Sequence, residues 1–204
     1  MKKIIIIGII TILLIIILPE HKYNNEDFNI KTYISNIDKD NDNIDDQTDI
    51  LNNAKKYVQT KPKYKSKYYE TGYPNDEYGV CTDVVGFALK DAGYNLMTLV
   101  NEDIKLHKER YNIKIIDKNI DFRRVNNLNI YFKYNSISLT LDPKEISSWQ
   151  GGDIVVFKRH IGIVSDKRNS KGISYVIHHA NPFQINYEED ILESNEIIGH
   201  YRIS

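Results

Sequence analysis

The order in which two hydrophobic patterns occur along the chain is the feature that most limits its fold. Apolar residues recur at helical spacing through the middle of the sequence, whereas the last third consists of short β-branched and aromatic runs separated by polar turns. Helices followed by strands are typical of the α+β class, in which a helical layer covers one face of a sheet. The sequence therefore predicts N-terminal helices packed on a C-terminal antiparallel β-sheet.

The helical pattern predicts a first helix that begins near Thr48, capped by Asp46 or Thr48, and a second from about Cys81 to Ala92 that ends at Gly93. Two further helices are expected near residues 102–111 and 122–132. The strand pattern predicts an antiparallel meander of four or five strands from the runs DIVVF, HIGIVSD, GISYVIHHA, FQINY and IIGHYRI.

The N-terminus reads as a targeting segment. Residues 1–19 start with two lysines, and an almost wholly aliphatic run follows from Ile4 to Leu18. This pattern is typical of a signal peptide, although a small-residue cleavage site and a lipobox cysteine are missing. The run is also shorter than the roughly 20 residues of a membrane span. We expect a signal anchor or a cleaved signal peptide rather than a buried core helix, with the rest of the chain outside the cytoplasm, secreted or attached to the membrane.

Residues 20–47 are polar, acidic and rich in Asn, so we expect a disordered linker before a domain that spans residues 48–204. The linker has the first half of a calcium-loop pattern, with three aspartates at alternating positions: Asp38, Asp40 and Asp42. That pattern has Gly where Asn43 lies and Glu where Asp49 lies. A solvated acidic linker is therefore the preferred interpretation, and no metal site is expected.

The chain has 204 residues, enough for one domain with a substantial core. Its formal net charge is −1, and no dense block of Lys and Arg stands out. We therefore expect no nucleic-acid partner.

Cys81 is the only cysteine of the chain. Exported proteins use cysteines in pairs, so a single one is an inert buried thiol, an intermolecular link or a reactive group. At the first turn of a helix, backbone N–H groups and the helix dipole favour the thiolate and lower the thiol pKa. A nucleophilic thiol also needs a histidine as base and a third polar group that orients the imidazole.

Two histidines of the predicted strands are suited to this chemistry. His160 opens one strand and His178 ends the next, so adjacent antiparallel strands set the two side by side. His178 and His179 point to opposite faces, and only one of them can join the site. A metal site made of Cys81, His160 and His178 is an alternative, but the spacing lacks the usual C-x-x-C and H-x-x-x-H patterns.

A helix-initial cysteine, WQGGDIVVF, RHIGIVSD and VIHHA, in this order, resemble the NlpC-type cell-wall cysteine peptidases, which have a papain-like core. More closely, the chain resembles the YijF-like family of exported bacterial proteins (domain of unknown function 1287). The segments that carry this resemblance are GYP at 72–74, GVCTDVV at 79–85, NIDFRRVNNL at 119–128, WQGGDIVVF at 149–157, HIGIVSD at 160–166, VIH at 176–178 and GHYR at 199–202.

The resemblance implies that Cys81 is the nucleophile, His160 the base and His178 the orienting residue. It further implies an extracytoplasmic thiol hydrolase that cleaves peptide or amide bonds in peptidoglycan and needs no cofactor; acyl transfer by the same thiol is closely related. The alternative is a non-catalytic module that binds the cell wall or a partner on the same fold.

Further residues are candidates for the site. The chain departs from the NlpC-type pattern with CTD in place of CSG, which puts Asp83 in the first helical turn. There it interacts favourably with the helix dipole but opposes a thiolate. Tyr73 is a candidate oxyanion donor beside the backbone N–H of Cys81, with a plain loop aromatic as the alternative. Arg123 and Arg124 are candidates for binding a substrate carboxylate, with surface ion pairs as the alternative.

Overall fold

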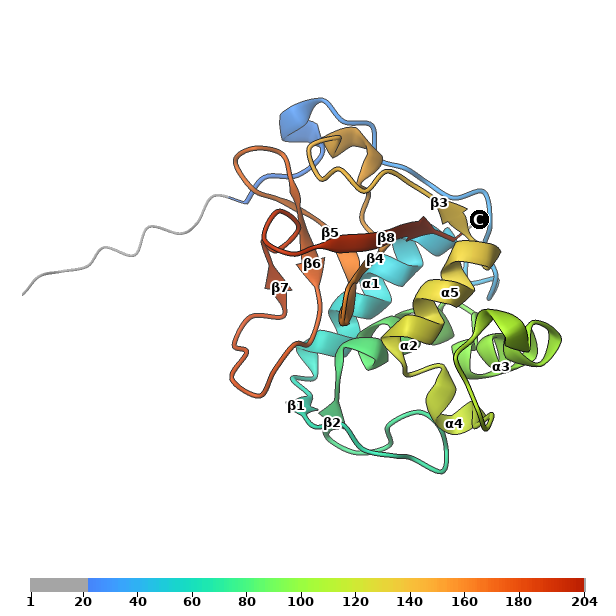
Figure 1. Ribbon diagram of the computed structural model, residues 1–204. Coiled ribbons are helices and arrows are strands. Elements are labelled where there is room, and N and C mark those ends of the chain that lie inside the picture. The colour runs from blue at the N-terminus through green and yellow to red at the C-terminus, as the bar shows by residue number, and fades with distance from the viewer. Residues whose placement is uncertain (1–21, 204) are drawn as a thin grey trace, which may run out of the picture.

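The computed structural model describes residues 22–203, in which N-terminal helices pack against a six-stranded antiparallel sheet (Figure 1). This confirms the α+β prediction. The predictions for residues 1–19, together with Glu20 and His21, lie outside the described residues. Between residues 22 and 203, none of the helices has the length and apolar character that a membrane crossing requires.

The helices begin and end where local signals place them. A hydrogen bond from the Thr48 amide to the side chain of Asp45 caps the first helix, one residue before the predicted cap. The second helix runs into a turn at Gly93, where φ is +85°, as predicted. The third begins earlier than expected because Asn95 caps it, which leaves His107 at its C-terminal end. The helices are α1 (Asp46–Gln59), α2 (Cys81–Asp91), α3 (Leu96–Leu106), α4 (Lys118–Asp121) and α5 (Val125–Asn135).

The main sheet has the strand order β3-β8-β4-β5-β6-β7. Its strands are β3 (Ile137–Ser138), β4 (Ile154–Phe157), β5 (His160–Arg168), β6 (Ser174–Ile177), β7 (Glu188–Glu189) and β8 (Ile197–Arg202). The meander prediction holds from β4 to β7 but is wrong for β8, which returns to pair with β4. It is also wrong for FQINY, which forms a loop before β7. A separate parallel pair joins β1 (Lys63–Tyr64) and β2 (Tyr78–Gly79).

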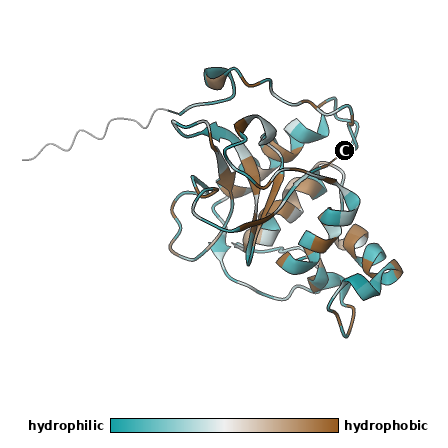
Figure 2. Cartoon of the chain, turned by 45° about the horizontal axis from the view of Figure 1, so that its top comes forward, coloured by the Kyte–Doolittle hydropathy of each residue, from teal (hydrophilic) through white to brown (hydrophobic). Residues whose placement is uncertain are grey.

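Both faces of the central strands are buried. Ile154, Val156, Ile161 and Ile163 belong to the core that the helices cover, together with residues of α1 and α2. The alternate residues of β4 and β5 pack with Trp149 in a second, smaller cluster on the other face. Figure 2 shows the apolar residues gathered on these strands and on the inner sides of the helices. The apolar core holds α2, and therefore Cys81, against β5.

Residues 22–45 lie on the domain, where a disordered linker was expected, and cross its upper side in Figure 1. Tyr23 forms a β-bridge with Arg168, and the side chain of Asn25 donates to Gln150 at 3.0 Å. Asn25 also accepts a hydrogen bond from the buried guanidinium of Arg168, at 2.7 Å. The composition misled here because these polar side chains satisfy buried partners rather than water.

Candidate active site

Cys81 is the first residue of α2 and directly follows β2. The carboxylate of Asp83 accepts a hydrogen bond from the backbone N–H of Val80 at 2.8 Å, which fixes the start of the helix. Cys81 is half-buried. Its sulfur interacts with the backbone N–H groups of Ile161, on β5, and of Thr82. Ile161 directly follows His160 in the sequence, so the thiol contacts the backbone next to this histidine.

The thiol is neutral in this environment. Burial raises the pKa of Cys81 to about 11, and the charge of Asp83 acts in the same direction. The N–H groups of Ile161 and Thr82 oppose this shift but do not outweigh it. The prediction of a lowered thiol pKa is therefore wrong, because loss of hydration destabilises the thiolate more than the N-terminus of the helix stabilises it.

His160 and His178 are joined by a hydrogen bond between Nε2 of the former and Nδ1 of the latter, at 2.9 Å. The rings meet edge to face, with centroids 4.9 Å apart. Gly162 makes this approach possible, since a Cβ atom there would lie 2.8 Å from the carbonyl of Ile177 and 3.2 Å from Cβ of His178. A side chain at position 162 would therefore push the two histidines apart.

Glu189 extends this pair on the side away from Cys81. Its carboxylate lies 3.0 Å from Nε2 of His178. The side-chain amide of Gln184 also approaches Nε2 of His178, at 3.4 Å. When His178 carries its hydrogen on Nε2, that hydrogen faces the carboxylate and Nδ1 accepts from Nε2 of His160. That order leaves Nδ1 of a neutral His160 unprotonated, and within the described chain this atom makes no hydrogen bond. The series of contacts Glu189–His178–His160 thus ends in Nδ1 of His160, which can accept a proton.

Both rings are neutral at physiological pH. Burial lowers the pKa of His160 to about 4, and the nearby His179 acts in the same direction. Burial lowers the pKa of His178 to about 3, with smaller contributions from His160 and His179. Neutral rings are what the hydrogen-bond order requires, because a protonated His178 has no lone pair to accept with. Cys81 makes no hydrogen bond to either ring in the described residues.

His179 points away from the pair formed by His160 and His178. Its ring makes edge-on contacts with Tyr64, on β1, and with Tyr187. Nδ1 of His179 is buried without a hydrogen-bond partner in the described residues. Of the two adjacent histidines, His178 is thus the one that reaches His160.

Tyr73 does not lie at the site as an oxyanion donor, and this prediction is wrong. Its ring packs against Phe87 and Phe122 in the core, and only 7% of the residue is exposed. Its hydroxyl lies near the backbone N–H groups of Leu96 and Met97, at the start of α3. Packing of the aromatic ring in the core, rather than a role for the hydroxyl, determines where Tyr73 lies.

Asp83 and Arg123 form a buried ion pair instead of a substrate-binding group. The guanidinium contacts both carboxylate oxygens, at 2.6 and 2.9 Å, and donates to the Lys67 carbonyl at 2.7 Å. The prediction that Arg123 binds a substrate carboxylate is wrong, because its donors already have partners inside the fold. Arg124 is exposed and lies 3.5 Å from the buried carboxylate of Asp121, so it forms an ion pair with one partner inside the fold.

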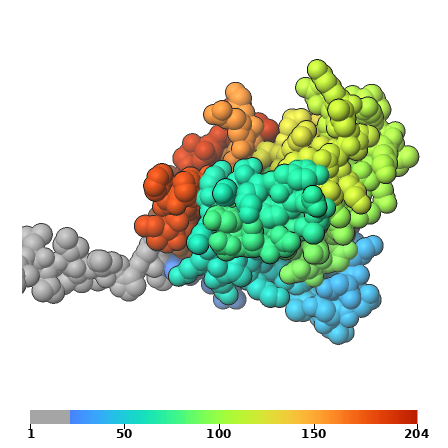
Figure 3. Space-filling view, turned by 90° about the horizontal axis from the view of Figure 1, so that it is seen from below, coloured from blue at the N-terminus to red at the C-terminus, as the bar shows by residue number. Residues whose placement is uncertain are grey.

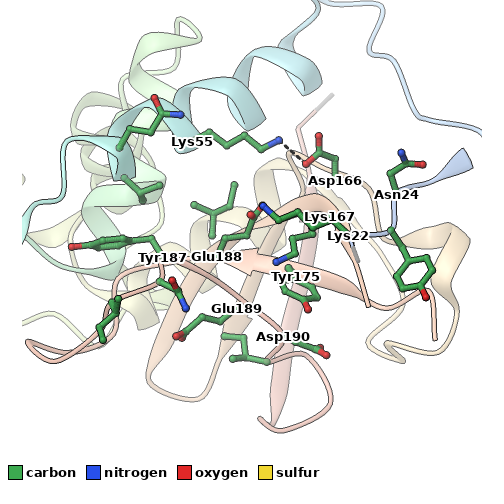
Figure 4. A pocket seen from close by; sticks show the side chains of 17 residues that line it. Lys22, Asn24, Lys55, Asp166, Lys167, Tyr175, Tyr187, Glu188, Glu189 and Asp190 are labelled. Atoms are coloured by element: carbon green, nitrogen blue, oxygen red, sulfur yellow. Dashed lines mark hydrogen bonds and ion pairs between the residues drawn. The ribbon is translucent and has the colours of Figure 1, made fainter. Parts of the chain in front are cut away.

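A hollow of about 1040 Å³ opens on the β7 side of the sheet (Figure 4). Glu189 lines it, with Ile177, Tyr175 and Tyr187, whereas Cys81, His160 and His178 do not. Residues 61–79 cover the centre of the face seen in Figure 3. Tyr187 donates to the Pro62 carbonyl at 3.1 Å, which ties this loop to the segment before β7. Of the residues Glu189, His178, His160 and Cys81, only Glu189 lines the hollow.

The comparisons with known proteins give the family of the chain. The family model described as "Domain of unknown function (DUF1287)" matches residues 51–203. The chain belongs to this family. It is 34% identical over 166 residues to "Uncharacterized protein YijF" of Escherichia coli (strain K12), a match that covers 75% of this chain and 80% of that protein. No solved structure matches the chain.

Glu189 is the residue of this site that the sequence analysis missed. The acidic stretch after the strand of His178 is visible in the sequence as YEED, at 187–190. Its partner was hidden because the contact depends on the loop of residues 178–187 folding back so that β7 pairs with β6. Register between strands, rather than residue type, decides which acid reaches the ring.

Proposed function

We propose that the protein is an extracytoplasmic thiol hydrolase with a papain-like, NlpC-type core that cleaves peptide or amide bonds in peptidoglycan. Cys81 is the nucleophile, His160 the base and His178 the residue that orients it. The observation that supports this proposal best is the chain Glu189–His178–His160, which ends in a proton-accepting nitrogen one residue from the Ile161 N–H that contacts the thiol.

In the proposed reaction, Sγ of Cys81 attacks the carbonyl carbon of the substrate while its proton passes to Nδ1 of His160. The backbone N–H of Cys81 donates to the oxygen that becomes negative. His160 then returns the proton to the leaving nitrogen, and the C–N bond breaks to give a thioester. Water hydrolyses the thioester and regenerates the thiol. A neutral thiol and a neutral imidazole suit this sequence, since contacts between catalytic groups often tighten only when substrate binds.

The state of the thiol favours a second candidate function, a non-catalytic module that binds the cell wall. The thiol pKa is raised, and no hydrogen bond joins Cys81 to His160 within the described residues. In that case the site would hold a wall peptide without cleaving it.

Incubation of purified peptidoglycan with the wild-type protein and with Cys81→Ala, followed by mass spectrometry, separates the two candidates. Fragments released by the wild type alone support the hydrolase and identify the bond. Sedimentation of both proteins with the peptidoglycan, without any fragments, contradicts the hydrolase and supports the binding module. A matched control is Ser194→Ala, which changes an exposed hydroxyl away from the site and should leave cleavage unchanged.

A further inference from the structure

An acidic loop precedes α1, on residues that the proposed hydrolase does not use. Asp38, Asp40 and Asp42 each offer one carboxylate oxygen, and these three oxygens lie within 4.8 Å of one another. No other group of three His, Cys, Asp or Glu ligand atoms between residues 22 and 203 is this compact. Three carboxylates at this separation repel one another, and backbone N–H groups of residues 42–44 that donate to them offset only part of this repulsion. A cation between them would offset the rest.

The loop follows the geometry of a twelve-residue calcium loop. Such loops take ligands from positions one, three, five, seven and twelve and turn sharply at position six. Counted from Asp38, position six is Asn43, whose φ of +72° is left-handed although the residue is not Gly. Asn therefore serves here as Gly does in the consensus. The loop then continues into α1, and position twelve lies in the first turn of this helix.

Position twelve is Asp49, and its burial provides an observation independent of the acidic cluster. Only 6% of Asp49 is exposed, and no hydrogen bond to its side chain exists within residues 22–203. The amide of Asn53 lies near it, but Nδ2 of Asn53 is itself buried without a hydrogen-bond partner. A buried carboxylate without a hydrogen bond requires another partner, and a cation fits this need.

Asp49 lies close to the loop, since the charges of Asp42 and Asp40 act on its carboxylate. It stands beside the compact group of three carboxylates rather than within it. The two remaining aspartates of the segment are engaged elsewhere. Asp45 accepts hydrogen bonds from the amides of Ser35 and Thr48, and Asp46 accepts from the Lys39 backbone and the Tyr94 hydroxyl.

We propose that residues 38–49 form a calcium site, in which Asp38, Asp40, Asp42 and Asp49 bind one Ca²⁺ and the carbonyl of Ile44 completes the protein ligands. An all-oxygen, highly charged and flexible ligand set is one that Ca²⁺ accepts, whereas Mg²⁺ prefers a smaller octahedral site with several waters. Asp at position twelve is shorter than the usual bidentate Glu. We therefore expect affinity in the range of extracellular calcium modules, a Kd of about 10⁻⁴–10⁻³ M.

The test is a calorimetric titration of the full chain with calcium chloride, up to roughly 10 mM, and separately with magnesium chloride. The expected result is one equivalent of bound Ca²⁺ and a rise in Tm of roughly 3–6 °C when calcium is at ten times its Kd. Absence of calcium binding, or equal affinity for magnesium, would overturn the proposal.

Variants identify the ligands. Asp40 is exposed, so Asp40→Asn should fold as the wild type does and bind Ca²⁺ at least tenfold more weakly. Glu196→Gln removes the same charge from an exposed position outside the loop and should bind within about twofold of the wild type. If both variants lose affinity equally, the effect is one of net charge and the proposed site is wrong. Asp49→Asn, checked for folding by circular dichroism, should also lose Ca²⁺ binding. Wild-type Ca²⁺ affinity in this folded variant would contradict the role of Asp49 as a ligand.

Discussion

Glu189 acts at the scale of a single proton, since its carboxylate lies 3.0 Å from Nε2 of His178 and favours a hydrogen on that nitrogen. With an amide at position 189, Nε2 of His178 can meet either a donor or an acceptor, so the order of the hydrogen-bond chain is no longer imposed. The proposed base would then spend part of its time with a proton on the nitrogen that must accept one.

We predict that Glu189→Gln lowers kcat/KM for peptidoglycan cleavage by about 100-fold, the effect of a misoriented catalytic group. The measurement is the rate of fragment release. Glu193→Gln is the matched control, because Glu193 only pairs with Lys171 at the surface. Its rate should equal that of the wild type. Equal rates for wild type and Glu189→Gln would show that the carboxylate does not control which nitrogen atoms of the two histidines carry a hydrogen.

The thiol of Cys81 offers a second prediction at this scale, about pH. Burial raises its pKa to about 11 from an ordinary value of 9.0, so at neutral pH it forms about 100-fold less thiolate than an ordinary cysteine. Alkylation by iodoacetamide should therefore be slow at pH 7 and accelerate as the pH rises toward 11. Mass spectrometry gives the rate without ambiguity, because the chain has a single cysteine.

The unfolded protein in urea is the control for this experiment, and its cysteine should react at the ordinary rate. Fast alkylation of the folded protein at pH 7 would mean that the thiolate is stabilised by His160 despite its burial. That outcome would contradict the neutral resting state described above.

At the scale of the element, the ion pair of Asp83 and Arg123 joins the start of α2 to the turn between α4 and α5. Both side chains are almost fully buried, so loss of one partner leaves an uncompensated charge in the core. Arg159 carries the same charge at an exposed position, which makes it a matched control for Arg123.

Arg123→Met should lower the free energy of unfolding by about 3–5 kcal/mol. Arg159→Met should lower it by no more than about 0.5 kcal/mol, because this side chain is exposed. Urea denaturation followed by circular dichroism measures both values. Similar losses for the two variants would contradict a structural role for the buried pair.

Elements differ in how far the sequence determines them. The periodicity of α2 and the position of Gly93 predicted that helix to within one residue, because both signals are local. The place of β8 beside β4 was not predictable in this way, since strand pairing depends on contacts between distant segments. Cys81, His160 and His178 were found as residue types at strand and helix ends, whereas the positions of Tyr73 and Arg123 depended on packing that one sequence does not reveal.

At the scale of the whole molecule, the N-terminal segment is part of the domain. Asn25 is the clearest link, because it supplies the acceptor for Nε of Arg168, a side chain only 1% exposed. Arg168 in turn holds the carbonyls of Trp149 and Gly172. One polar residue of the expected linker therefore completes a buried network around Arg168, at the end of β5.

Asn25→Ala should lower the free energy of unfolding by about 1.5–3 kcal/mol, because it leaves a buried charged donor without its acceptor. Asn24→Ala, one residue earlier and exposed, should change it by no more than about 0.5 kcal/mol. Thermal and urea unfolding of the full chain provide the comparison. If Asn25→Ala is as stable as Asn24→Ala, the segment is not held to the domain through this contact.

The docking of residues 22–45 also sets how far the domain can travel from whatever holds its N-terminus. A free chain over the 28 residues from 20 to 47 would span about 90 Å when extended. In the structure nearly all of that length lies along the surface of a domain whose radius of gyration is about 16 Å. If residues 1–19 anchor the protein as proposed, the tether has almost no slack. The domain would then work within a few tens of Å of the bilayer, on the membrane-proximal layer of the wall rather than across its thickness.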